Sequence, residues 1–184
     1  SPKSYNNFYG VPLSISNFNP NFSYGVFEVG MSKFNEINKL SQLVKPHIGI
    51  ITNVSEAHLE NFRNIKDIAK AKSEIIYNIQ KGGSVILNRD DKFFEYFKKI
   101  EKKNEIRVTS FGFSKASDIR FISLRKKQNS FLLSLLVYKK KLIVKINNGN
   151  KNNIMNILLS ISVINELNLP LIKIKNFFKD KLLL

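Results

Sequence analysis

The sequence predicts an α/β fold in which a mostly parallel, layered sheet is flanked by helices and carries a small antiparallel meander. Three observations predict it. Short β-branched apolar runs alternate with segments of helical period over residues 22–113. Glycine, proline or paired aspartates separate these segments. From about residue 118, alternating strands are joined by short basic turns, which is typical of antiparallel pairing.

The first cycle of this pattern covers residues 22–54. FSYGVFEVG (22–30) and HIGIITNV (47–54) predict two buried strands. Between them, residues 33–44 place apolar side chains every three or four positions, which describes one face of a helix. The three segments predict a βαβ unit, right-handed and parallel.

The second cycle and the meander follow in order. A helix is expected over 64–79, ended by Lys81-Gly82-Gly83, and then a strand over 84–88. The remaining expected elements are a helix at 92–102, a strand near 106–113, the meander strands 118–124, 130–138 and 141–147, and a helix at 153–167 before Pro170.

Composition limits the class of protein. A chain of 184 residues with 43% hydrophobic content can form one domain, or one and a small fraction, with a real core. No apolar run approaches the roughly 20 residues needed to cross a bilayer, and no signal-peptide pattern is present. The absence of cysteine excludes disulfides. We therefore expect a cytoplasmic protein without a membrane partner.

The net charge of +16 raises the alternative of a basic binding module for nucleic acid or an anionic surface. The lysines are scattered along the chain, however, and abundant lysine, asparagine, isoleucine and phenylalanine are typical of a low-GC genome. Aromatic and basic residues do not interleave as they do in single-strand binders. Solvated helix ends and turns explain the lysines better, and no nucleic-acid partner is expected.

Two side chains are expected at the carboxyl ends of neighbouring strands, where ligands bind in open α/β sheets. Glu28 ends the strand at 22–30, and His58 follows the strand at 47–54 by a few residues. Each residue alone is better explained as a structural or solvent-facing group. Together, a carboxylate and an imidazole could hold Mg²⁺ only with phosphate oxygens and water completing the octahedron, which implies a nucleotide.

The helix after His58 carries a lysine of less obvious role. Lys70 and Glu74 lie one turn apart and are expected to pair on the surface. Lys72 lies two residues from both and therefore points elsewhere, toward the crevice, where it could meet phosphate or a metal.

Several segments, in this order and spacing, resemble the central domain of the Mur ligases. They are SYNNFYGVPLS, FEVGMSKFNEINKLSQLVKPHIGIITNVSEAHLENF, IAKAKSEI and GGSVILNRDD. The resemblance is most specific from residue 4 to about 91, and it is looser to the helix at Asn156. Within the family it favours the branch that adds D-alanyl-D-alanine. It implies a nucleotide-binding fold of the phosphate-loop type.

The resemblance implies a metal and catalytic set of three residues. Glu28, in E-x-G, and His58, in N-V-x-x-A-H-L-E, would each bind one of two Mg²⁺ ions at the phosphates of ATP. Lys72, in K-A-K-x-E-I, matches a lysine that family members carry as a carbamate, a carboxylate-like group that bridges metal or positions water.

The resemblance also implies binding residues. Ser4, Asn6 and Asn7 fall in the loop near the γ-phosphate and the muramoyl peptide, so they are assigned to substrate, with Asn7 also assigned to nucleotide. Asn88 and Asn156 are assigned to nucleotide, Asn156 at the adenine. The implied reaction is ATP-driven amide formation through an acyl phosphate, joining D-alanyl-D-alanine to UDP-MurNAc-tripeptide for peptidoglycan, in a monomeric enzyme.

The sequence departs from the family pattern in two places. It has no G-x-x-G-K-[ST] phosphate loop, and Asn150 and Asn152 replace the Gly and His of the G-x-H-x-x-x-N element. We expect a fragment: a partial central domain over 1–168 and a tail over 169–184 leading toward a missing C-terminal domain, with no ligase turnover of its own. A folylpolyglutamate or cyanophycin synthetase-like ligase remains the enzymatic alternative.

Overall fold

The computed structural model describes residues 5–56 and 60–171. Its centre is one six-stranded sheet in which the strands follow one another in sequence order. The strands are β1 (Ile48–Ile51), β2 (Ser84–Asn88), β3 (Arg107–Gly112), β4 (Ile119–Lys127), β5 (Ser130–Val137) and β6 (Lys140–Ile146). The first four are parallel neighbours, and β4, β5 and β6 pair antiparallel. This mixed sheet confirms the expected fold class.

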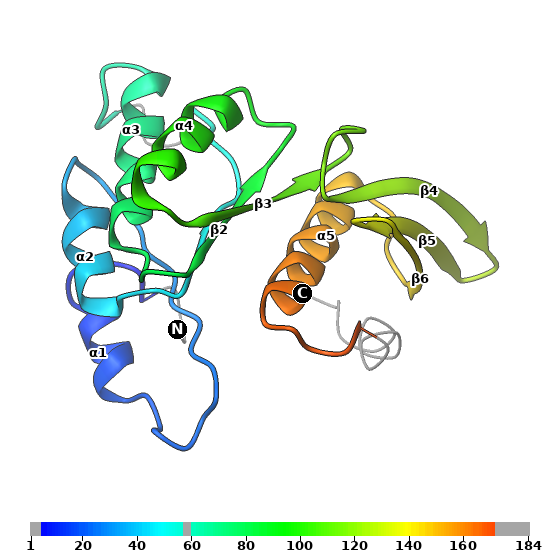
Figure 1. Cartoon of the computed structure of the whole chain (residues 1–184), viewed down its shortest axis with the longest axis horizontal. Coiled ribbons are helices and arrows are strands. Elements are labelled where there is room, and N and C mark those ends of the chain that lie inside the picture. The colour runs from blue at the N-terminus through cyan, green and yellow to red at the C-terminus, as the bar shows by residue number, and fades with distance from the viewer. Residues whose placement is uncertain (1–4, 57–59, 172–184) are drawn as a thin grey trace.

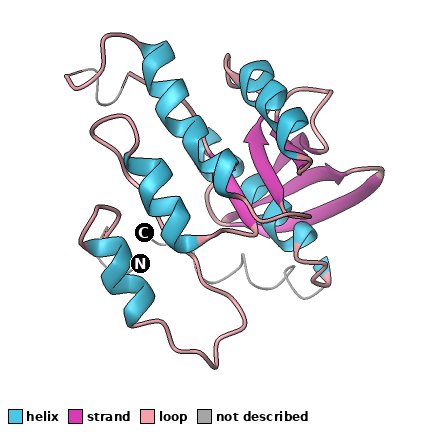
Figure 2. Cartoon of the chain, turned by 60° about the vertical axis from the view of Figure 1, so that its left-hand side comes forward, coloured by secondary structure: helices cyan, strands magenta, loops and turns pink. Residues whose placement is uncertain are grey.

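Helices lie on both sides of the sheet (Figures 1 and 2). They are α1 (Gly10–Ser16), α2 (Glu36–Val44), α3 (Ile65–Ser73) with the 3₁₀ turn η2 (Glu74–Asn78), α4 (Phe94–Asn104) and α5 (Lys151–Glu166). The first four stand together beside β1–β3, whereas α5 packs against β2, β3 and β4 (Figure 1). Among the described residues, no helix combines the length and apolarity that a membrane span requires.

Strand β2 separates two hydrophobic clusters. Val85 and Leu87 face the helices α2–α4, and Ile86 between them faces α5, because successive side chains of a strand point to opposite faces. All three are fully buried. Burial on both faces explains why this strand reads as a continuous apolar run rather than an alternating one.

The expected strand at 22–30 is wrong. The structure gives this segment no strand, and among the described residues β1 pairs only with β2. Its alternating side chains Phe22, Tyr24 and Val26 are 64%, 53% and 80% exposed. A strand is stabilised by a ladder of hydrogen bonds to a neighbouring strand, and among the described residues no strand pairs with this segment. The sequence pattern also did not predict α1.

Candidate active site

The side chain of Asn6 connects Glu28 to the N-terminal loop. Its amide nitrogen donates to Oε1 of Glu28 at 2.9 Å, and its backbone carbonyl accepts from the N–H of Gly30 at 2.7 Å. A Cβ at position 30 would come within 3.0 Å of the Asn6 amide carbon, so glycine permits this close approach. The Glu28 carboxylate is held from one side and stays exposed to solvent.

Asn7 organises the turn that begins α1. Its Oδ1 accepts from the backbone N–H groups of Tyr9 and Gly10 at 3.1 and 2.9 Å, and its carbonyl accepts from Val11 at 3.0 Å. The side-chain oxygen therefore already has two donors. In this arrangement Asn7 supports the shape of the loop that holds Asn6.

Asp91 connects the segments that follow β1 and β2. Its Oδ2 accepts from the N–H of Val54 at 2.7 Å, and its Oδ1 accepts from the N–H of Phe93 at 2.8 Å. The same carboxylate acts on Lys72 of α3. Burial lowers the pKa of the Lys72 ammonium from its usual 10.5, and the negative charge of Asp91 opposes part of that shift.

The half-buried Lys72 differs from its exposed neighbour Lys70, as the spacing predicted. The expected pair of Lys70 with Glu74 is wrong. Glu74 instead accepts from the N–H groups of Asn35 and Asn38 at 2.7 and 3.0 Å, at the start of α2. The Lys70 ammonium lies 5.6 Å from the centre of the Phe34 ring. Orphan amides at a helix start attract a carboxylate more strongly than an exposed i, i+4 lysine does.

The two assigned asparagines lie on different elements. Asn88 ends β2, and its Oδ1 accepts from the N–H of Asp90 at 2.9 Å. It is thus at the carboxyl edge of the sheet, beside Asp91. Asn156 is exposed on α5, where its carbonyl accepts from the Ser160 hydroxyl.

The structure brings the expected site residues together only in part. Asn6 and Glu28 are in contact, and Lys72 is grouped with Asp91 and Val54. His58 and Ser4 lie outside the described residues, so the convergence of Glu28, His58 and Lys72 stays a prediction. Within the described part of the chain, no three His, Asp or Glu side chains form a metal-binding group. A magnesium site built on Glu28 would therefore need oxygen atoms from a bound nucleotide and from water.

Sequence reasoning missed Asp91. The available signal was the position of the Asp90-Asp91 pair, shortly after the buried strand at 84–88. By sequence pattern alone, paired aspartates indicate only a boundary between segments. The partner residue Asp90 has its own role: its carboxylate accepts from the N–H groups of Phe113 and Ser114 at 2.6 and 2.8 Å. The two carboxylates therefore fix the segments after β1 and β3 against the end of β2.

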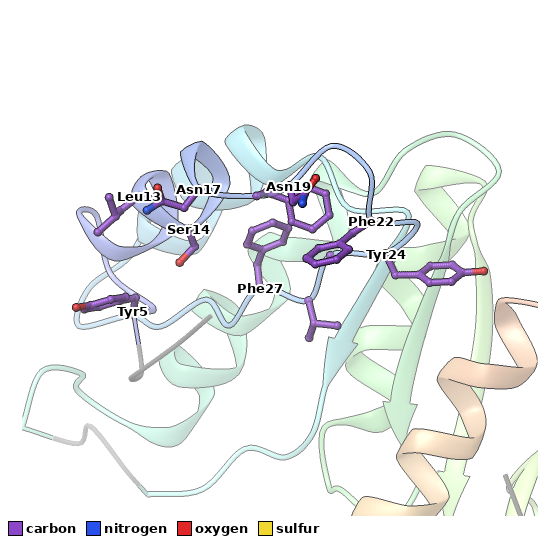
Figure 3. A pocket seen from close by; sticks show the side chains of 11 residues that line it. Tyr5, Leu13, Ser14, Asn17, Asn19, Phe22, Tyr24 and Phe27 are labelled. Carbon is purple, nitrogen blue, oxygen red and sulfur yellow. The ribbon is translucent and has the colours of Figure 1, made fainter. Parts of the chain in front are cut away.

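An aromatic pocket of about 280 Å³ is lined by residues of α1 and of the segment before Glu28 (Figure 3). Tyr5 and Phe27, the chain neighbours of Asn6 and Glu28, both line it. The Phe18 ring lies 6.2 Å from Phe22 and 5.9 Å from Phe27 between ring centres.

Comparison with known protein families identifies the family of this chain. Residues 1–164 match the model of the Mur ligase middle domain. The chain belongs to the Mur ligase family. Several relatives carry the name UDP-N-acetylmuramoyl-tripeptide--D-alanyl-D-alanine ligase. One from Rickettsia prowazekii is 35% identical over 120 residues, which is 65% of this chain and 27% of that protein. One from Buchnera aphidicola is 36% identical over 125 residues, or 68% and 25%.

Several solved structures show the same fold. MurF from Acinetobacter baumannii superposes with a TM-score of 0.87 at 25% identity, covering 96% of this chain and 38% of that one. MurF from Thermotoga maritima in complex with ADP gives 0.76 at 24% identity, covering 92% and 39%. A mutant of L. casei FPGS gives 0.65 at 14% identity, covering 84% and 38%. This Mur ligase chain spans less than half the length of each.

Proposed function

We propose that this chain is the ATP-binding central domain of a ligase that joins D-alanyl-D-alanine to UDP-MurNAc-tripeptide. The relatives of that name, 35–36% identical over about two thirds of the chain, carry the proposal. The geometry supports it in two ways. Glu28 does not end a strand as expected, but it presents an exposed carboxylate that Asn6 holds in place. Lys72, whose pKa burial lowers, interacts with Asp91, which follows the carboxyl end of β2.

The residues present suit a magnesium nucleotide. Glu28 offers an exposed carboxylate oxygen, the ligand type that Mg²⁺ prefers, and Asn6 fixes its orientation. Mg²⁺ usually takes only one or two carboxylates and completes its shell with water and phosphate oxygens. A sparse protein ligand set, Glu28 with His58 as the second, is therefore sufficient for ATP with two Mg²⁺ ions.

Lys72 suits the carbamate that the family resemblance implies. Only a neutral amine can add carbon dioxide, and burial increases the neutral fraction by lowering the lysine pKa. The ammonium would first lose one proton, and addition of carbon dioxide to the neutral amine would form an N–C bond and release a second proton to solvent. The resulting anion would then face Asp91. A second cation, such as Mg²⁺, would relieve that repulsion. Carbamylation of Lys72 and binding of Mg²⁺ would therefore favour each other.

The bound nucleotide would supply the phosphoryl group that activates the terminal carboxylate of the tripeptide for attack by the D-alanyl-D-alanine amine. The residues of this chain would position and neutralise charge, which is the main protein contribution to phosphoryl transfer. Asn6 holds Glu28 in place, and Asp91 fixes the Val54 backbone four residues before His58. Asn88, Asn156 and Asn7 would contact the nucleotide. Ser4, Asn6 and Asn7, which belong to the N-terminal loop, would contact the substrate.

The test uses the complete reading frame that contains this chain. With ATP, Mg²⁺, UDP-MurNAc-tripeptide and D-alanyl-D-alanine, we expect UDP-MurNAc-pentapeptide, ADP and phosphate, detected by mass spectrometry. The Glu28→Gln variant should lose most turnover while keeping its fold. Turnover with a folate and glutamate, or with the cyanophycin substrates, and none with the muramoyl peptide would favour the alternative ligases instead.

A further inference from the structure

More than half of the net charge of the chain, +9 of +16, falls in the stretch that holds the meander and most of α5. Residues 119–165 contain nine lysines and arginines and no aspartate or glutamate. This stretch includes β4, β5 and β6, which extend away from α2–α4 (Figure 1). Its basic residues therefore have no acidic neighbours along the chain to offset their charge. Local charge of one sign raises the local concentration of anionic partners.

The two faces of the meander differ in what they cover. Leu133, Leu135, Val144 and Ile146 point inward and are buried in the cluster that includes α5. Because side chains alternate along a strand, their neighbours point outward. We call this outward set the meander outer face: Arg125, Lys127, Leu132, Leu136, Lys141, Ile143 and Lys145.

Pairing across the strands places cations beside aliphatic side chains on this outer face. Arg125 is opposite Leu132, which is opposite Lys145, and Leu136 is opposite Lys141. All four cations of the face are exposed, and Ile143 between Lys141 and Lys145 is 47% exposed. A hollow of about 600 Å³ at the β4–β5 turn, lined in part by Lys127, Leu132 and Lys145, adds room for an anionic group.

We propose that the meander outer face docks on an anionic phospholipid surface. Its charge complements acidic headgroups, and its exposed Ile143, flanked by the half-buried Leu132 and Leu136, can enter the interface between them. No aromatic residue belongs to this face, which disfavours single-stranded nucleic acid, since its bases need stacking platforms. This peripheral contact departs from the expectation that the chain has no membrane partner.

The test is sedimentation of the full chain with vesicles of phosphatidylcholine alone or with about one third phosphatidylglycerol. We expect binding to the anionic vesicles only, and weakening as salt rises toward about 0.5 M. The double variant Lys141→Gln/Lys145→Gln should lower the partition coefficient about tenfold or more. Ile143→Ser should lower it severalfold without a change of charge.

The matched control is Lys66→Gln/Lys99→Gln, which removes the same charge from exposed positions on α3 and α4. It should bind as the unchanged chain does, and circular dichroism checks that each variant is folded. The proposal is overturned if the control loses as much binding as the meander variant, or if no anionic vesicles are bound. Tight binding of a single-stranded RNA that is insensitive to Ile143→Ser, without vesicle binding, would also overturn it.

Discussion

The carboxylate of Asp91 accepts a 2.7 Å hydrogen bond from the backbone N–H of Val54, a residue 37 positions earlier in the chain. Its second oxygen accepts from Phe93 at 2.8 Å. One side chain thus fixes the segment after β1, which continues to His58, against the end of β2. The Asp91 carboxylate also supplies a negative charge that acts on the half-buried Lys72.

Removing this carboxylate should destabilise the fold. Asp91→Ala leaves two backbone donors without their acceptor, and we expect the free energy of unfolding to fall by about 1–3 kcal/mol. Asp91→Asn keeps one acceptor oxygen and should recover part of the loss. Urea denaturation of the three proteins checks this order. Equal stability of Asp91→Ala and the unchanged chain would show that water replaces the carboxylate without cost.

The buried lysine predicts a pH dependence of stability. Burial lowers the folded-state pKa of Lys72 below its unfolded value of 10.5, so the unfolded chain binds this proton more tightly. Between those two pKa values the unfolded state carries more of the proton, and stability contributed by Lys72 rises with pH. Relative to Lys72→Met, the unchanged chain should gain stability from neutral pH to about pH 10.

The measurement is urea denaturation of both proteins across that range. Subtracting the Lys72→Met values removes the titration of all other groups, provided their environments are unchanged. A difference between the two proteins that stays constant with pH, or falls as pH rises, would contradict the burial of this ammonium in the folded state.

Two glycines with positive φ should respond differently to a methyl group. Gly112 has φ +152°, and a Cβ there would lie 2.6 Å from the Asp90 carboxylate that accepts from Phe113 and Ser114. Gly82 has φ +79° and open space around it. Gly82→Ala should cost about 1–2 kcal/mol from backbone strain alone. Gly112→Ala should cost more, because strain and displacement of Asp90 add.

Thermal denaturation of both variants checks the order. If Gly112→Ala is as stable as Gly82→Ala, then Asp90 moves freely, and its two backbone hydrogen bonds do not hold the ends of β2 and β3 together.

These 184 residues alone should show no ligase turnover. The sequence contains no glycine-rich loop with a lysine to hold the ATP phosphates, so positioning of the γ-phosphate would be lost. The assay measures phosphate release that depends on both UDP-MurNAc-tripeptide and D-alanyl-D-alanine. Such release from the purified chain would show that its own residues suffice to hold the nucleotide.

The sequence predicted the elements whose local apolar pattern matches the side that the fold buries. Residues 84–88 form a strand at the expected bounds, because both faces are apolar and Gly82 supports the preceding turn with a positive φ. The three meander strands were confirmed for the same reason, since periodicity records which side is buried. The helix expected over 33–44 begins at Glu36, and Ile37 and Leu40 of its apolar face are buried, whereas Leu43 is 57% exposed.

Features that depend on distant partners could not be predicted. Alternation over 22–30 indicated a strand, but pairing requires a neighbour that the described residues do not provide. Glu74 has backbone partners at the start of α2, which no helical spacing reveals. The side-chain contact of Asn6 with Glu28 spans 22 positions, and Asp91 reaches Val54 across 37. Such contacts follow from the fold and not from local pattern.

The central claim is that Glu28, His58 and Lys72 surround one magnesium nucleotide. A crystal structure of the complete protein with a non-hydrolysable ATP analogue and Mn²⁺, located by anomalous scattering, tests it most directly. We predict metal peaks coordinated by the Glu28 carboxylate and the His58 imidazole, at about the 2.1 Å typical of Mg²⁺ sites, with the Lys72 terminus beside them. Metal and phosphates bound away from all three side chains would contradict the account.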